Sequence, residues 1–347
     1  MRYIGSKTRI ADEILDVAGQ PIAGECGDFV DAFCGTGVVA SAASQRGWRV
    51  RINDHLTSAT TIATASLLSS QQVGFAHLGG YSRAIEILQD LSSRAGFVWR
   101  EYSPASSMYG AARIRRMYFT EENAGVIDAI RYEIALWKSQ NLINESEESL
   151  LLADLLLAAN RVANISGTYG CFLREWQPSA LKPLALVPRK LPDRSFLVES
   201  TCADVFGIST KSSDLIYLDP PYTKRQYAAY YHILETICKN DEPQVDGVTG
   251  LRPWKNFASD FCYKRKALNA IVSLIRTLKS SRVLLSYSSE GHVKLEEITA
   301  ALNESHFVQV HQLGKIGRYR PNRTAASKND SVSEFLLDIR SKQNWSS

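Results

Sequence analysis

The pattern that most constrains the fold is an alternation of short apolar strands with helices. This alternation occurs at both ends of the chain and is missing from the middle. Two strands are predicted early, at Asp28–Phe33 and Trp48–Asn53, and a helix of small residues, Val38–Gln45, lies between them. The later predicted strands, most of them separated by helices, are Phe196–Val205, Asp214–Leu218, Val283–Ser286, Phe307–Val310 and Glu334–Ile339. Such alternation predicts an α/β protein with one mainly parallel sheet.

The middle of the chain has a different character. Residues 58–165 carry mostly helical signals, among them Glu122–Lys138 and Leu150–Ala163, and residues 164–194 are rich in glycine, proline and basic groups and are predicted to form a loop. We therefore predict a sheet domain made of residues 1–57 and 195–347, with residues 58–194 inserted as a mostly helical domain.

Composition excludes several classes of protein. No run of 18 uncharged apolar residues occurs, so a membrane span is not expected. The start of the chain lacks the apolar stretch of a signal peptide. The six cysteines form no CxxC pair, which argues against a metal site and a disulfide framework and favours a reducing, cytoplasmic location. The formal net charge of +4 is too small to indicate a nucleic-acid partner by itself.

A glycine-containing turn follows the first predicted strand, in the sequence Asp31-Ala32-Phe33-Cys34-Gly35-Thr36-Gly37. Gly35 and Gly37 permit a tight turn and close approach of a ligand to the backbone. Asp54, which ends the second strand, is placed where a carboxylate can bind both hydroxyls of a ribose. The dinucleotide fingerprint is incomplete, because its third glycine is missing, and a plain α/β turn is the alternative. Together the turn and Asp54 predict a nucleoside-containing cofactor.

The tetrapeptide Asp219-Pro220-Pro221-Tyr222 directly follows the strand Asp214–Leu218, so it is expected at the carboxyl edge of the sheet, where open α/β proteins bind ligands. Two prolines stiffen the turn and remove two N–H donors. The Asp219 carboxylate and the Pro220 carbonyl are two acceptors suited to an exocyclic amino group, and Tyr222 offers a flat face for a planar base. A generic proline loop is the alternative, which this context disfavours.

These motifs, in this order, resemble the Dam-like D12 class (alpha group) of N6-adenine-specific DNA methyltransferases. Tyr3-Ile4-Gly5-Ser6-Lys7 is similar to the first cofactor motif of that family, and the glycine turn, Asp54, a long insertion and the tetrapeptide follow. Two later stretches are also similar to family motifs, namely Arg225-Gln226-Tyr227 with Tyr231-His232, and Ser286-Tyr287-Ser288-Ser289-Glu290-Gly291.

The resemblance implies a Rossmann-like class I sheet that binds S-adenosylmethionine and an inserted target-recognition domain. It implies that Lys7 faces the methionine carboxylate, Asp31 the methionine amino group and Asp204 the adenine N6 of the cofactor. The full set of cofactor residues that we expect is Tyr3, Lys7, Asp31, Phe33, Gly35, Gly37, Asp54, Asp204 and Asp219, and the catalytic residues are Asp219, Pro220 and Tyr222.

Basic residues cluster in two places. The segment Ser305–Asn329 contains no acidic residue, and Arg113-Ile114-Arg115-Arg116 adds positive charge within the insertion. Basic runs usually cover solvated faces, but next to a base-modifying site phosphate contact is the better interpretation. The predicted DNA contacts are Arg115, Arg116, Lys315, Arg318, Arg320 and Arg323.

The expected reaction is therefore methylation of adenine N6 in a specific sequence of double-stranded DNA, by a solitary methylase or beside a cognate restriction endonuclease. Methylation of cytosine N4 is one alternative, which an aspartate at position 219 disfavours. A DNA-binding repressor with a vestigial methylase fold is another, and the intact tetrapeptide and glycine turn argue against it.

Overall fold

The structure, a computed structural model, describes residues 5, 7–21, 27–317 and 331–342. The chain divides into two compact units. The sheet unit consists of Gly5–Leu67, Phe196–Gln226 and Phe257–Ser347, and the helical unit contains Leu68–Ser195 and Tyr227–Asn256.

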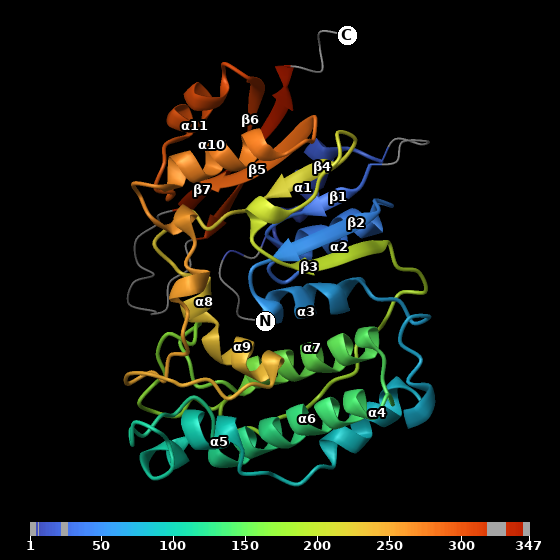
Figure 1. The fold of residues 1–347 in the computed structure, drawn as a ribbon, viewed down its shortest axis with the longest axis vertical. Helices are drawn as coiled ribbons and strands as arrows, with labels where there is room; N and C mark the ends of the chain where they lie inside the picture. The colour runs from blue at the N-terminus through green and yellow to red at the C-terminus, as the bar shows by residue number, and fades with distance from the viewer. Residues whose placement is uncertain (1–4, 6, 22–26, 318–330, 343–347) are drawn as a thin grey trace. The chain divides into compact units, whose positions relative to one another are not determined.

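The sheet unit contains a seven-stranded sheet with the strand order β3-β2-β1-β4-β5-β7-β6 (Figure 1). Neighbouring strands from β3 to β5 are parallel, whereas β7 runs antiparallel to both β5 and β6. Strands from both ends of the chain interleave, as the alternation predicts, but the sheet is mixed because of β7. The strands are β1 (Phe29–Asp31), β2 (Val50–Asp54), β3 (Leu197–Cys202), β4 (Leu215–Leu218), β5 (Arg282–Ser288), β6 (His306–Gly317) and β7 (Ser331–Ser341).

Helices cover both faces of this sheet because successive side chains of a strand point to opposite faces. In β1, Phe29 packs into the core beneath α1 (Ala11–Ala18), α2 (Val38–Gln45) and α3 (Thr57–Leu67). Its neighbour Val30 packs into the second core, beneath α10 (Ala267–Thr277) and α11 (Leu295–Leu302). The inner strands β1, β4 and β5 are thus buried on both sides, which accounts for the near-continuous apolar sequences of β4 and β5.

The helical unit is built around two long helices that begin at polar caps. The Thr120 side chain accepts a hydrogen bond from the Asn123 N–H at the start of α6, and Asn144 and Glu147 form a capping box at the start of α7. Its helices are α4 (Tyr81–Gln89), α5 (Phe97–Tyr102), α6 (Glu121–Ser139), α7 (Glu145–Val162), α8 (Tyr227–Tyr230) and α9 (His232–Lys239). Short 3-10 helices in the chain occupy Ala76–Leu78, Pro104–Ser107, Val205–Gly207, Lys255–Phe257 and Asp260–Cys262.

The units differ from the predicted domains at two points. The predicted boundary at residues 57 and 58 falls at the start of α3, which belongs to the sheet unit. The segment Tyr227–Asn256, which we assigned to the sheet domain, joins the helical unit, because buried Ile233 and Ile237 of α9 find their apolar surroundings next to α6 and α7. The helix predicted at Arg225–Cys238 is divided at Tyr231 into α8 and α9.

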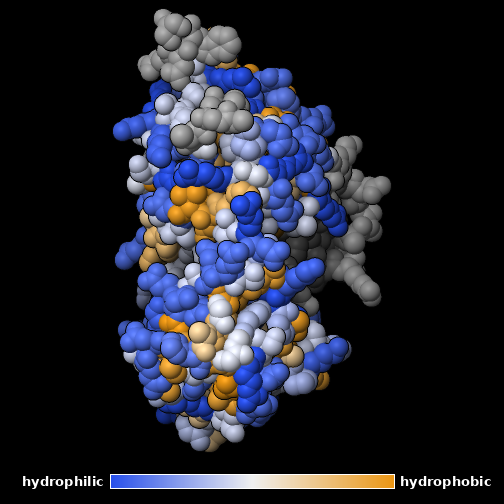
Figure 2. Space-filling model, turned by 90° about the vertical axis from the view of Figure 1, so that its right-hand side faces the viewer, coloured by the Kyte–Doolittle hydropathy of each residue, from blue (hydrophilic) through white to orange (hydrophobic). Residues whose placement is uncertain are grey.

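On the face shown in Figure 2, hydrophobic side chains form separate patches between hydrophilic ones. In the described part of the chain, no helix is long and apolar enough to cross a membrane.

Candidate active site

Acidic residues follow four neighbouring strands of the sheet unit. Asp31 and Asp54 end β1 and β2, Asp204 comes two residues after β3, and Asp219 directly follows β4. Because these strands are parallel, all four carboxylates lie at the same carboxyl edge. The structure therefore brings together at one edge the acids that the sequence singled out.

The glycine turn between β1 and α2 is held in place by Asp54. One oxygen of the Asp54 carboxylate accepts a hydrogen bond of 2.9 Å from the Gly35 N–H, and the other accepts one of 3.0 Å from the Leu56 N–H. Gly37 has a positive φ of 76°, and a Cβ atom there would lie 2.8 Å from the Cα of Ala63. Glycine is thus required at position 37, both by the backbone conformation and by the close approach of α3.

Asp31 is a buried carboxyl group whose Oδ1 atom has no hydrogen-bond partner among the described residues. Burial, together with the negative charges of Asp219 and Asp54, raises its pKa to about 8. A carboxyl in such surroundings gains greatly from a cationic partner. This orphaned oxygen fits the amino group of a bound methionine moiety.

Asp204 lies beside a group of aromatic rings. It is exposed, and its carboxylate caps the 3-10 helix Val205–Gly207 by accepting a 2.9 Å hydrogen bond from the Phe206 N–H. The Phe206 ring stacks on Phe261 with a centroid distance of 6.1 Å, and Phe33 meets Phe261 edge-on at 5.5 Å. The sequence marked Phe33 but not Phe206 or Phe261. No pattern in the sequence connects Phe261 to the cofactor motifs.

The tetrapeptide forms the loop after β4, with Pro220 buried and Asp219 17% exposed. The Lys7 ammonium lies 3.1 Å from the Asp219 carboxylate. Burial raises the pKa of Asp219 to about 6, with Lys7 lowering it and Glu334 raising it. The structure shows the Lys7 ammonium between the carboxylates of Asp219 and Glu334, and its expected contact with the methionine carboxylate stays a prediction.

The stretch Ser286–Gly291, at the end of β5, packs against the tetrapeptide through Tyr287. The Tyr222 and Tyr287 rings meet edge to face, with centroids 5.8 Å apart. The Tyr287 hydroxyl accepts a hydrogen bond of 3.1 Å from the Val293 N–H. A Cβ at Gly291 would lie 2.3 Å from the Tyr287 ring, so glycine at 291 allows this ring its place.

Glu334 is a buried residue of this site that sequence reasoning missed. Its carboxylate lies 3.1 Å from the Lys7 ammonium. The sequence does contain a signal for Glu334, namely its alternation with apolar residues along the strand. Glu334 shares its face of β7 with Val332 and Leu336, both of which are buried. An acid on the buried side of a strand needs a partner.

The predicted DNA contacts have different outcomes. Arg116 is 0% exposed and pairs with Glu101 at 2.9 Å, so the prediction that it contacts DNA is wrong. Its guanidinium also donates to the carbonyls of Gly247 and Val248, at 3.1 Å each. Arg115 is exposed, and its DNA contact stays a prediction. Lys315 lies in β6, but its side chain is outside the described residues, as are Arg318, Arg320, Arg323 and the cofactor residue Tyr3.

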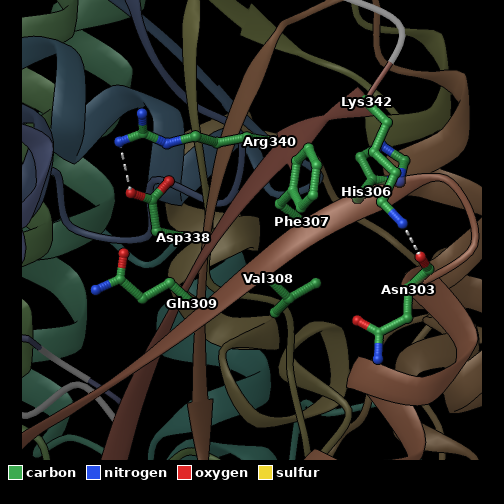
Figure 3. A pocket seen from close by; sticks show the side chains of 8 residues that line it. All are labelled: Asn303, His306, Phe307, Val308, Gln309, Asp338, Arg340 and Lys342. Carbon is green, nitrogen blue, oxygen red and sulfur yellow. Dashed lines mark hydrogen bonds and ion pairs between the residues drawn. The ribbon is translucent and has the colours of Figure 1, made fainter. Parts of the chain in front are cut away.

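A pocket of about 420 Å³ lies between β6, β7 and the end of α11 (Figure 3). Asp338 in this pocket forms an ion pair with Arg340. In the β5–β7 ladder Arg340 is opposite Arg282, at the start of β5, whereas Glu334 is opposite Ser288, at its end. The pocket therefore lies at the end of the sheet opposite to the carboxyl edge, where the four carboxylates lie. Among the described residues, no group of His, Cys, Asp or Glu could hold a metal ion.

Comparison with known proteins identifies the class to which this site belongs. Residues 3–301 match the family of D12 class N6 adenine-specific DNA methyltransferases, and the chain belongs to this family. The seven-stranded mixed sheet is consistent with the fold of an S-adenosylmethionine-dependent methyltransferase.

Individual relatives are similar over nearly the whole chain. Modification methylase StsI of Streptococcus sanguinis is 34% identical over 99% of this chain and 52% of its own length. Type II methyltransferase M.FokI of Planomicrobium okeanokoites is 34% identical over 98% of this chain and 52% of its own length. Type II methyltransferase M.NlaIII of Neisseria lactamica is 33% identical over 86% of each chain. The chain thus spans about half the length of the first two relatives and most of the third.

Proposed function

We propose that this chain transfers a methyl group from S-adenosylmethionine to the N6 atom of adenine in a specific sequence of double-stranded DNA. The observation that carries the proposal is the position of the Asp219-Pro220-Pro221-Tyr222 loop, at the same sheet edge as Asp31, Asp54 and the glycine turn. Family membership favours adenine N6 over cytosine N4 and over a vestigial repressor. The names of the relatives support a modification role, beside a cognate restriction endonuclease.

The residues at the sheet edge fit the parts of the cofactor. Asp54 binds the ribose hydroxyls, Asp31 binds the methionine amino group, and Asp204 with the Phe206 ring binds the adenine. When bound, S-adenosylmethionine supplies a methyl group activated by the positive sulfonium. Asp54 also holds Gly35, so the same carboxylate shapes the turn and contacts the ligand.

The target adenine is flipped out of the duplex, because its amino group is otherwise paired inside the helix. Tyr222 stacks on the base, and the Asp219 carboxylate and the Pro220 carbonyl accept hydrogen bonds from its two N6 hydrogens. These acceptors draw the nitrogen towards tetrahedral geometry and aim its lone pair at the methyl group. The N–C bond forms as the C–S bond breaks, and one N6 proton is released.

The helical unit is the part proposed to recognise the DNA sequence. Arg113 and Arg115 are exposed there, and so are the large side chains of Met108, Tyr109 and Val248. Exposed cations contact phosphates, and exposed aromatic and apolar side chains contact bases. The buried Arg116 supports this surface by joining the Arg115 segment to the loop at Gly247–Val248.

Product analysis tests the proposal. The purified chain is incubated with radiolabelled S-adenosylmethionine and mixed-sequence duplex DNA, and the DNA is digested to nucleosides. We expect label in N6-methyldeoxyadenosine. Label in N4-methyldeoxycytidine would support the first alternative. Binding of DNA without any transfer would support the repressor and contradict the proposal.

A further inference from the structure

Lys7 is shared by two acidic side chains from different strands. Its side chain is 4% exposed, and its ammonium lies 3.1 Å from Asp219 Oδ1 and 3.1 Å from Glu334 Oε2. Burial opposes the positive charge of Lys7, but the carboxylates of Asp219 and Glu334 outweigh this effect and raise the pKa of Lys7, so the lysine stays cationic. The ammonium therefore joins Glu334 to the first residue of the tetrapeptide.

Glu334 also reaches the last residue of the tetrapeptide. The Tyr222 hydroxyl donates to Glu334 Oε1 across 3.4 Å. Burial raises the pKa of Tyr222, which keeps this hydroxyl protonated and able to donate. The two oxygens of one carboxylate thus contact Lys7 and Tyr222, and the Lys7 ammonium also lies 5.4 Å from the centre of the Tyr222 ring.

The backbone that carries Glu334 is held firmly. Glu334 is opposite Ser288 in the antiparallel β5–β7 ladder. Next to it, the Ser289 N–H donates to the Ser333 carbonyl at 3.0 Å, and the Ser333 N–H donates to the Ser289 hydroxyl at 3.2 Å. A side chain on a paired strand is positioned more accurately than one on a loop. The Glu334 side chain is therefore well placed to fix the positions of the tetrapeptide residues that it contacts.

We propose that Glu334 is a positioning residue for methyl transfer, which holds Lys7 against Asp219 and fixes the Tyr222 hydroxyl. The acceptor at 219 and the stacking ring at 222 then keep the spacing that a flipped adenine requires. Glu334 also shares the positive charge of Lys7, so that Asp219 keeps more of its strength as an acceptor. This inference rests on the proposed function and adds a residue that acts on the substrate only through others.

Charged and titratable groups from several elements surround Asp219. Lys7 precedes α1, Asp31 ends β1, Tyr217 lies in β4, Tyr222 is in the same loop, and Glu334 lies in β7. Glu334→Gln keeps a side-chain oxygen that can accept from Lys7, so the lysine stays near Asp219 while the raising effect of the Glu334 charge is lost, and the pKa of Asp219 falls below its value of about 6. Since the ionised Asp219 is the active form, activity should then persist to lower pH.

Glu334→Gln is the direct test, because it keeps the size of the side chain and removes its charge. We expect kcat to fall about tenfold to a hundredfold, as for other small misplacements in an active site. With S-adenosylmethionine saturating, the acid limb of the pH profile of kcat/KM for DNA should move to lower pH. The dissociation constants of DNA and S-adenosylmethionine should stay within about threefold of the wild type.

Asp338→Asn is the matched control. Asp338 is a buried acid on the same strand, paired with Arg282 and Arg340, at the other end of the sheet. We expect this variant to lower the melting temperature without moving the acid limb. A shift in Asp338→Asn equal to that in Glu334→Gln would overturn the inference, because a general loss of charge on β7 would then be the cause.

Further outcomes keep the inference falsifiable. A wild-type kcat and an unmoved acid limb in folded Glu334→Gln would overturn it. If Glu334→Gln fails to fold, Glu334→Asp keeps the charge and shortens the side chain by one methylene. A reduced kcat with an unmoved limb would then support the inference, and a wild-type kcat would overturn it. Failure of the proposed function is separately visible, because the wild-type chain itself would form no N6-methyldeoxyadenosine.

Discussion

Binding of S-adenosylmethionine should release a proton from Asp31. The carboxyl is buried, its Oδ1 has no partner among the described residues, and its pKa is raised to about 8 by burial and by the charges of Asp219 and Asp54. At pH 7 the carboxyl of the ligand-free protein is therefore about nine-tenths protonated. A cationic amino group beside it favours the ionised form, so binding drives the proton off.

The size of the effect follows from this pKa. Below pH 8, each fall of one pH unit should weaken cofactor binding about tenfold, which corresponds to about 1.4 kcal/mol. The stability of the ligand-free protein should have the opposite pH dependence, rising as the pH falls. A carboxyl with a raised pKa in the folded state destabilises increasingly as pH rises from about 4, where the unfolded chain ionises, to about 8, where the folded one does. Asp31→Asn removes both effects.

Isothermal titration calorimetry in two buffers with different ionisation enthalpies measures the proton release. We expect close to one proton per cofactor at pH 7 for the wild type and a much smaller value for Asp31→Asn. The amino group of the cofactor titrates in both proteins, so the difference isolates Asp31. We also expect Asp31→Asn to raise the melting temperature of the ligand-free protein at pH 8 but not at pH 4. Equal proton release by the two proteins would refute the reasoning.

Three further predictions concern the glycine turn and the two neighbouring arginines. Gly37→Ala should lower the free energy of unfolding by about 1–3 kcal/mol in urea denaturation, because its Cβ would meet Ala63 at a positive φ; unchanged stability would contradict the close contact between Gly37 and α3. Arg116→Met should lower that free energy by about 3–5 kcal/mol, because it removes the buried cation of Glu101 and leaves only the more exposed Arg100, 3.5 Å away. Arg115→Gln should leave stability unchanged and reduce the salt dependence of DNA binding by about one unit of slope, and an unaltered slope would show that Arg115 contacts no phosphate.

The sequence predicted those parts of the site that depend on local order. Asp31, Asp54 and Asp219 each end or follow an apolar strand, and parallel pairing alone then brings them to one edge. The glycine turn was equally readable, since tight turns of this kind use few residue types.

Contacts between distant segments were not readable from the sequence. Lys7 and Glu334 are 327 positions apart, and only the pairing of β7 with β5 places Glu334 near the tetrapeptide. Arg116 was misassigned for a related reason. In the sequence it is one of several neighbouring basic residues, and nothing local shows that Glu101 and the carbonyls of Gly247 and Val248 enclose it.

The central claim is that Asp219 and its neighbours form the methyl-transfer site, and the single-turnover rate of Asp219→Asn tests it most directly. The measurement uses saturating S-adenosylmethionine and DNA that carries the methylated sequence identified for the wild type, so that binding does not limit the rate. Asp219→Asn keeps one side-chain oxygen that can accept, but it loses the negative charge and the ion pair with Lys7. This loss predicts a rate lower by about a hundredfold or more, with near-native dissociation constants for both ligands. Methylation of adenine N6 by Asp219→Asn at the wild-type rate would contradict the account.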